Sequence, residues 1–163
     1  MERKTEQLQI RVTRAQKRMI RRLAAAAGMD VSSYVLSRAL PAKKRRWQEL
    51  IERLAAGDEE RYVLAALNDL LAELGPEEFG ETVAGTDVRA LPKRLQNQVA
   101  AMTERAAERL GAERPAWTAE VSPLERPYFA STLPGLRLYL LRASPVVFRR
   151  RNLFVDASVG DRI

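Results

Sequence analysis

Two different periodicities follow each other near the start of the chain. Residues 7–12 alternate polar and apolar side chains, with Leu8, Ile10 and Val12 as the apolar set. A period of two is typical of a strand with one buried face. From Thr13 onward the apolar residues recur three or four positions apart, which predicts a helix. Because a six-residue strand is not stable by itself, we expect it to pair with another strand.

Local signals predict the ends of two helices after this strand. Thr13 and Gln16 have the spacing of a capping box, so the first helix is expected to begin there. Gly28 is expected to end this helix in the left-handed conformation. Asp30 is a good N-cap for a second helix, and Pro41 is expected to end it.

Three longer amphipathic helices are predicted over residues 42–57, 58–74 and 91–110. The apolar stripe of the first consists of Trp47, Leu50, Ile51 and Leu54. Asp58 is the expected N-cap of the second helix. Residues 76–90 are rich in glycine and proline and are predicted to form a loop.

The last fifty residues predict shorter elements. Ser122-Pro123 and Ser144-Pro145 each combine an N-cap residue with proline at the first helical position, so two short helices are expected. Residues 152–159 are interpreted as a terminal strand. The fold class is therefore predicted to be mainly α, with one short N-terminal strand and a mostly helical C-terminal domain.

Composition excludes several classes of function. The chain has no cysteine and no histidine, so disulfides, thiolate zinc sites and the usual general base are all missing. The remaining polar residues show no catalytic spacing, and we expect neither an enzyme nor a bound cofactor. The acidic cluster Glu77, Glu78, Glu81 and Asp87 matches no calcium loop, so no metal site is predicted.

The location of the protein is predicted from its apolar segments. No apolar run approaches the roughly 18 residues of a membrane span, and the basic, polar start lacks the apolar segment of a secretory signal. We therefore expect a soluble, cytoplasmic protein without a membrane partner.

Charge is distributed unevenly along the 163 residues. Residues 1–53 hold 14 Lys and Arg against 5 Asp and Glu, residues 54–88 hold 1 against 9, and residues 89–163 hold 13 against 7. A strongly basic first third favours a polyanionic partner there. The run Lys43 to Arg46 is interpreted as a solvated helix face, although a phosphate contact of Lys43 or Lys44 remains an alternative.

The order strand, helix, glycine turn and second helix resembles the ribbon-helix-helix family of DNA-binding proteins over about residues 3–40. Within that family it is most similar to TacA-like antitoxins, through the stretch "KTEQLQIRVT" and the turn "GMDVS". The resemblance implies that the strand pairs with its mate in a homodimer. The implied dimer core consists of Leu8, Ile10, Val12, Ile20, Leu23, Tyr34 and Val35.

The same resemblance implies how DNA is bound. Gln7, Gln9 and Arg11 would point together from the ribbon into the major groove and contact bases of an operator in double-stranded DNA. Four further residues would contact phosphates, two before the strand and two at the start of the second helix: Arg3, Lys4, Ser32 and Ser33. Asp30 departs from the commoner serine and places a carboxylate beside this phosphate site.

A simpler interpretation of the same segment is also available. Residues 7–12 would then form an ordinary edge strand of an α+β domain, and the basic face of the first helix would only be solvated. Under this interpretation the strand pairs within its own chain.

The tail carries one distinctive stretch, "SPVVFRRRNLFV", residues 144–155. It resembles the C-terminal segment of small bacterial proteins encoded beside nucleotidyltransferase-like toxins. We expect partner contacts from exposed aromatic, apolar and arginine residues. These are Phe129, Leu138, Tyr139, Phe148, Arg149, Arg150 and Arg151. The alternative is a short capped helix with Phe148 in the core and the three arginines exposed.

These observations lead to one principal hypothesis and two alternatives. The chain is expected to consist of a ribbon-helix-helix domain over 1–41, a connecting helix over 42–57 and a helical partner-binding domain over 58–163. The principal hypothesis is a transcriptional repressor that acts as the antitoxin of a toxin-antitoxin pair, binds its cognate toxin and represses its own operon. The alternatives are a stand-alone regulator that oligomerises or senses a ligand through its C-terminal domain, and an interaction protein without DNA binding.

Overall fold

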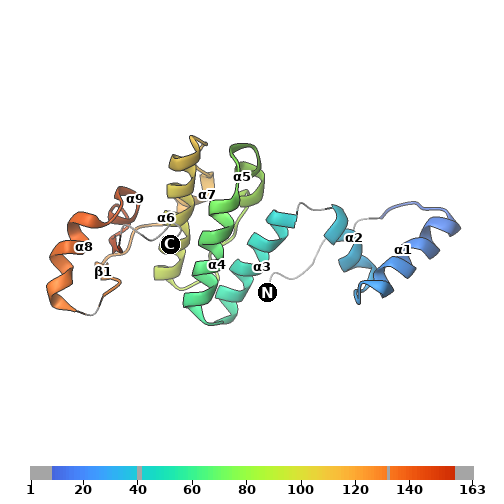
Figure 1. The fold of residues 1–163 in the computed structure, drawn as a ribbon, viewed down its shortest axis with the longest axis horizontal. Coiled ribbons are helices and arrows are strands. Elements are labelled where there is room, and N and C mark those ends of the chain that lie inside the picture. Colours follow the sequence, from blue (N-terminus) through green and yellow to red (C-terminus); the bar gives the residue numbers. More distant parts are fainter. Residues whose placement is uncertain (1–8, 40–41, 132, 157–163) are drawn as a thin grey trace.

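The computed structural model describes residues 9–39, 42–131 and 133–156. Figure 1 shows a mainly helical chain with α1 and α2 at one end of the molecule, α3 to α7 in the middle and α8 and β1 at the other end. The helices are α1 (Arg14–Ala26), α2 (Val31–Ala39), α3 (Ala42–Ala56), α4 (Glu60–Glu73), α5 (Pro76–Val83), α6 (Lys93–Leu110), α7 (Ala116–Glu120), α8 (Arg137–Ala143) and α9 (Val146–Arg149), with a 3-10 turn η1 (Pro134–Leu136). Two short strands, β1 (Tyr128–Phe129) and β2 (Leu153–Phe154), complete the elements. The predicted mainly α fold class is confirmed.

Residues 9–39, which we call the head, contain α1 and α2 with the predicted caps. The backbone nitrogen of Gln16 donates to Thr13 Oγ1 at 3.2 Å, and that of Thr13 donates to Gln16 Oε1 at 2.9 Å. Gly28 adopts a φ of 65°, in the left-handed region that favours glycine. Asp30 Oδ1 accepts from the backbone nitrogen of Ser33 at 3.0 Å, as expected of an N-cap.

Residues 42–156, which we call the body, are built around one apolar core. Helices α3, α4, α5 and α6 pack against one another, and α7 and α9 pack on α6. The predicted stripe of α3 is buried as a whole, from Trp47 at 1% exposure to Ile51 at 7%. The helix expected to connect two domains is therefore part of the body's core.

The loop predicted over residues 76–90 is wrong, because α5 occupies its first half. Gly75 and Pro76, interpreted as the end of the preceding helix, are the N-cap and the first residue of α5. Glu78 Oε2 accepts from the backbone nitrogen of Gly75 at 3.3 Å, which completes the helix start. Phe79 is fully buried and holds the helix on the core.

Two predicted N-caps are also wrong. Helix α4 begins at Glu60 rather than after Asp58, whose carboxylate accepts instead from Arg53 Nε at 2.8 Å. No helix follows Ser122-Pro123, because the backbone nitrogen of Leu124 donates to the carbonyl of Arg151 at 3.3 Å. The backbone after Ser122-Pro123 therefore bonds to the segment at Arg151 and does not start a helix.

The second Ser-Pro pair does precede a helix, α9, which begins at Val146. The hydroxyl of Ser144 does not cap it. This hydroxyl instead bonds to the carbonyls of Leu140 at 2.6 Å and Val155 at 2.7 Å. Ser144 therefore joins α8 to the segment after β2.

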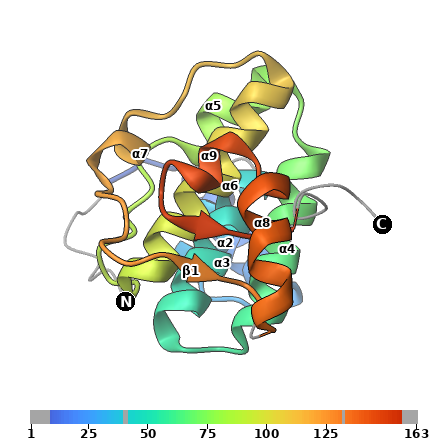
Figure 2. The ribbon, with the colours of Figure 1, turned by 90° about the vertical axis from the view of Figure 1, so that its left-hand side faces the viewer.

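The two strands form a parallel pair at the end of the molecule away from the head (Figure 2). The backbone nitrogen of Tyr128 donates to the carbonyl of Asn152, and that of Ala130 donates to the carbonyl of Phe154, both at 2.9 Å. The rings of Phe129 and Phe154 stack with centroids 4.8 Å apart. The predicted terminal strand is thus present over Leu153–Phe154, and residues 157–159 lie outside the described part of the chain.

Candidate nucleic-acid interface

Of the strand predicted over residues 7–12, the described residues 9–12 show no strand structure. These residues precede α1, and residues 7 and 8 lie outside the described ranges. Ile10 is 61% exposed and Val12 is 43% exposed. A strand of this length needs a mate for its backbone hydrogen bonds, and a single chain supplies none here.

The head leaves most of its apolar side chains uncovered. Within residues 9–39 the only buried residue is Ala24, where α1 meets α2. The exposed large apolar residues are Ile10, Val12, Met19, Leu23, Met29, Val31 and Leu36. A unit below about 40 residues rarely builds a sufficient core without oligomerisation, a metal or disulfides. The head therefore exposes more large apolar side chains than a unit of this size would bury by itself.

The residues implied as the dimer core occupy this same region. Leu23 is 41% exposed, and Ile20, Tyr34 and Val35 are half-buried along the contact of α1 with α2. Leu8 lies outside the described residues. The dimer itself stays a prediction because a single chain is described.

Gln9 and Arg11 are the described members of the predicted base-contacting set, and both are exposed. They alternate with Ile10 and Val12 immediately before the first turn of α1. Gln7 lies outside the described residues. An extended chain through residues 9–12 would place the two polar side chains on the side opposite the two apolar ones.

The start of α2 is less open to a phosphate than predicted. Ser32 is exposed and Ser33 is half-buried, but Asp30 already accepts the backbone nitrogen of Ser33. A phosphate at this helix end would therefore depend on the hydroxyl groups more than on the amide of Ser33. Arg3 and Lys4, the other predicted phosphate contacts, lie outside the described residues.

The basic run after α2 joins the head to the body. Arg45 Nη1 donates to the carbonyl of Ser37 at 3.0 Å, from α3 to α2. Lys43 Nζ donates to Glu78 Oε2 at 2.8 Å and to the carbonyl of Glu73 at 3.1 Å, and its hydrogen bond lowers the pKa of Glu78. Lys43 is thus used within the body, which weighs against the alternative of a phosphate contact.

The predicted partner surface of the tail is only partly exposed. Leu138 is 75% exposed and Tyr139 is 52% exposed, and Arg149 and Arg150 also face solvent. Phe129 is half-buried, stacked on Phe154, and the guanidinium of Arg137 lies 5.4 Å from its ring centroid.

Two residues of that prediction are wrong, because Phe148 is fully buried and Arg151 is 6% exposed. The guanidinium of Arg151 pairs with Glu104 through Nη2 and Oε1 at 2.6 Å. It also donates to the carbonyls of Thr118 at 2.7 Å and Val121 at 3.0 Å. Arg151 lies in the turn between α9 and β2, and this turn directs its side chain inward while Arg149 and Arg150 stay exposed.

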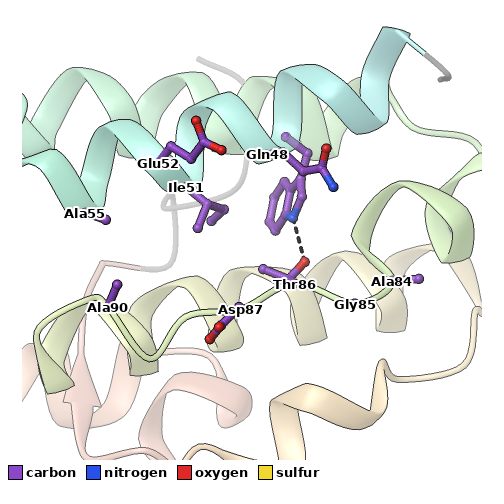
Figure 3. A pocket seen from close by; sticks show the side chains of 10 residues that line it. Gln48, Ile51, Glu52, Ala55, Ala84, Gly85, Thr86, Asp87 and Ala90 are labelled. Carbon is purple, nitrogen blue, oxygen red and sulfur yellow. Dashed lines mark hydrogen bonds between the residues drawn. The ribbon is translucent and has the colours of Figure 1, made fainter. Parts of the chain in front are cut away.

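A pocket of about 320 Å³ lies between α3 and the segment 84–90 (Figure 3). Trp47 Nε1 donates across it to Thr86 Oγ1 at 2.8 Å, and this hydroxyl donates to the carbonyl of Val83 at 2.7 Å. Arg89 donates hydrogen bonds to the carboxylate of Asp87, and these bonds lower the pKa of Asp87 from 3.8 to about 2. Three of the polar lining residues, Trp47, Thr86 and Asp87, are therefore already hydrogen-bonded within the chain.

Residues 9–39, 42–131 and 133–156 contain neither a membrane span nor a metal cluster. No helix in these ranges is both long and apolar enough to cross a membrane. The same residues contain no group of three or more carboxylates placed to hold a metal ion.

Comparison with known proteins gives a match to one family model. Residues 2–74 are similar to the NikA-like family, described as mobilization protein NikA. The match begins before the head and ends at the last residue before Gly75, so it includes α3 and α4 as well as α1 and α2. No curated protein and no solved structure matches the chain. The similarity supports a DNA-binding head of the ribbon-helix-helix type and gives no support to TacA-like antitoxins in particular.

Proposed function

We propose that the protein binds double-stranded DNA as a dimer through residues 1–39. The proposal rests on the large apolar side chains that the 31-residue head leaves exposed. They lie next to residues 9–12, in which polar and apolar side chains alternate. A twofold mate would cover this surface and supply the missing strand partner in one step. The similarity of residues 2–74 to the NikA-like family supports the same conclusion.

The alternation before α1 assigns the two sides of the resulting ribbon. Ile10 and Val12 would face the helices of the dimer, and Gln9 and Arg11 would face the DNA. A two-stranded ribbon fits the major groove, where glutamine pairs with adenine and arginine with guanine through two hydrogen bonds each. Twofold symmetry presents this set twice, so the bound site should be palindromic.

The experiment measures affinity for a duplex selected from random sequences by the wild-type protein. Gln9→Ala and Arg11→Ala should each weaken binding to it by about 1–3 kcal/mol per base contact, a factor of roughly 5 to 150 for each of the two contacts that a dimer loses. Binding to a scrambled duplex should change little. Gln48→Ala and Arg126→Ala, exposed on the body, are the matched controls. Wild-type affinity in both ribbon variants would show that the ribbon is not the base-reading element.

The process that this binding serves is proposed from the match. The matched family is described as a mobilization protein, so we propose a role in DNA mobilization rather than in repression. The autorepressing antitoxin with a cognate toxin, implied by the resemblance of the first forty residues, has no support from the comparisons.

The location of the selected site distinguishes the two roles. A site within a region needed for transfer of the DNA that carries this gene would support mobilization. A site that overlaps the gene's own promoter, together with co-purification of the neighbouring gene's product, would support the repressor instead.

A further inference from the structure

We propose that α1 carries a second DNA-contacting surface, a basic stripe made of Arg14, Lys17, Arg18, Arg21 and Arg22 that binds phosphates flanking the site held by the ribbon. The inference rests on the proposed DNA binding and extends it to a surface that base reading does not need.

The stripe is continuous along one side of α1, and its edge at Lys17 borders the buried Ala24. At 3.6 residues per turn its five side chains fall within an arc of about 140° around the helix axis, and Leu23 lies on the opposite side. The stripe runs about 12 Å along the axis, at 1.5 Å per residue. All five residues are exposed, whereas Ala24 is buried against α2. The stripe is therefore a surface free to meet a large partner.

The arrangement is unfavourable for α1 itself. Arg14 and Arg18, Lys17 and Arg21, and Arg18 and Arg22 are like-charged pairs four residues apart, a spacing at which repulsion destabilises a helix. Arg14 also lies in the first turn, where the partial positive charge of the helix disfavours a cation. The helix contains no acidic residue to offset these effects.

Basic side chains of the body, unlike those of the stripe, form ion pairs within the chain. Several of them pair with carboxylates, as in Lys43–Glu78, Arg53–Asp58, Arg94–Glu60, Arg114–Glu108 and Arg151–Glu104. Among the described residues the five stripe side chains form no ion pair, and the polar contact seen within the stripe joins Arg22 Nη2 to Met19 Sδ at 3.1 Å. No carboxylate of the described residues therefore offsets the charge of the stripe, and a polyanionic partner would do so.

A nucleic acid backbone fits the stripe better than a membrane surface does. An interfacial helix inserts its apolar side into the lipid, but α1 is in contact with α2, and on its apolar side Ala24 is buried and Ile20 is half-buried. A DNA strand carries one phosphate per 3.4 Å of helix axis, so about 12 Å of stripe faces three or four phosphates. The spacing matches five side chains that each reach a backbone oxygen.

The test uses the full-length triple variant Lys17→Gln/Arg18→Gln/Arg21→Gln. Its control is Arg61→Gln/Lys93→Gln/Arg126→Gln, which removes the same charge from exposed sites on the body. Affinity for the selected and scrambled duplexes is measured between about 50 and 200 mM salt. Removing one phosphate contact flattens the slope of log K against log salt by about 0.9, so three substitutions in each of the two protomers should make the slope shallower by about 5. Both duplexes should be bound at least about tenfold more weakly near 100 mM.

A stability measurement separates a DNA contact from damage to the fold. The stripe variant should melt at the same temperature as the wild type or higher, because the substitutions remove repulsion within α1. Weaker binding together with lower helicity in the absence of DNA would overturn the inference, as would affinity and salt slope equal to those of the control.

Two further outcomes are decisive. A wild-type protein that binds no duplex at all would refute the proposed function and this inference together, which distinguishes it from a failure of the stripe alone. If the stripe variant bound DNA like the wild type but no longer bound vesicles containing anionic phospholipid, the stripe would be a membrane-binding surface. This result would overturn the proposal.

Discussion

Arg151 offers the sharpest test of how the body is held together. Arg151→Met removes a guanidinium that is 6% exposed while keeping a side chain of comparable length. Glu104, itself 9% exposed, loses the partner that lies 2.6 Å away. The carbonyls of Thr118 and Val121 lose their donors as well. The substitution therefore leaves the buried carboxylate of Glu104 without its partner and removes a donor from each of three buried acceptors, the third being Asn97 Oδ1.

The expected cost is large for a single arginine. Removing one partner of a buried ion pair typically destabilises a protein by about 3–5 kcal/mol. For a chain of this size we expect the midpoint of thermal unfolding to fall by roughly 6–20 °C. Circular dichroism during heating and urea titration of the full chain measure both quantities. Arg150→Met, one residue away and exposed, should change stability by about 0.5 kcal/mol or less.

A double variant checks the physical cause. Arg151→Met/Glu104→Leu removes both charges and should recover much of the stability, because the unpaired carboxylate is gone. Equal midpoints for Arg151→Met and Arg150→Met would refute the reasoning, since Arg151 would then not be a buried structural cation. A double variant that is less stable than Arg151→Met alone would contradict the assignment of the cost to Glu104.

Two further predictions concern local features. Thr13→Ala should lower the stability of the head by about 1 kcal/mol, whereas Thr13→Ser, which keeps the hydroxyl that accepts from Gln16, should not; equal melting of the two variants would contradict the capping box. Because Arg89 holds the pKa of Asp87 at about 2, below 3.8, this carboxylate stabilises the fold above about pH 4 and loses that effect as the pH falls towards 2. Both side chains are largely exposed, so wild type and Asp87→Asn should differ by less than about 1 kcal/mol in urea titrations at pH 6 and should converge near pH 2.

Much of the helical architecture follows from short-range signals in the sequence. The capping box at Thr13, the left-handed Gly28 and the stripe that begins at Trp47 depend on neighbours within four residues, so pattern alone predicts them. The sequence pattern does not predict helix α5, because Gly75 and Pro76 follow the end of one helix and also form the start of the next. The proline followed by two glutamates is the available signal of a new helix start.

Contacts between distant segments could not be predicted in the same way. The tail contributes Arg151 to a network with Glu104, 47 positions earlier in the sequence, and no local pattern specifies that pairing. The partner surface predicted around Phe148 fails for the same reason, since its ring is buried by α6 packing against α9. The predicted ribbon depends on a second chain, so neither the sequence pattern nor one chain can establish it by itself.

Sedimentation velocity of the full chain, with and without the selected duplex, tests the central claim most directly. The account predicts a dimer of about twice 18.4 kDa at micromolar concentration and two chains on each duplex. Ile10→Asp, which would bury charge between the two strands, should sediment as a monomer and bind no duplex. A folded wild-type monomer at micromolar concentration that binds the duplex one to one would contradict the account.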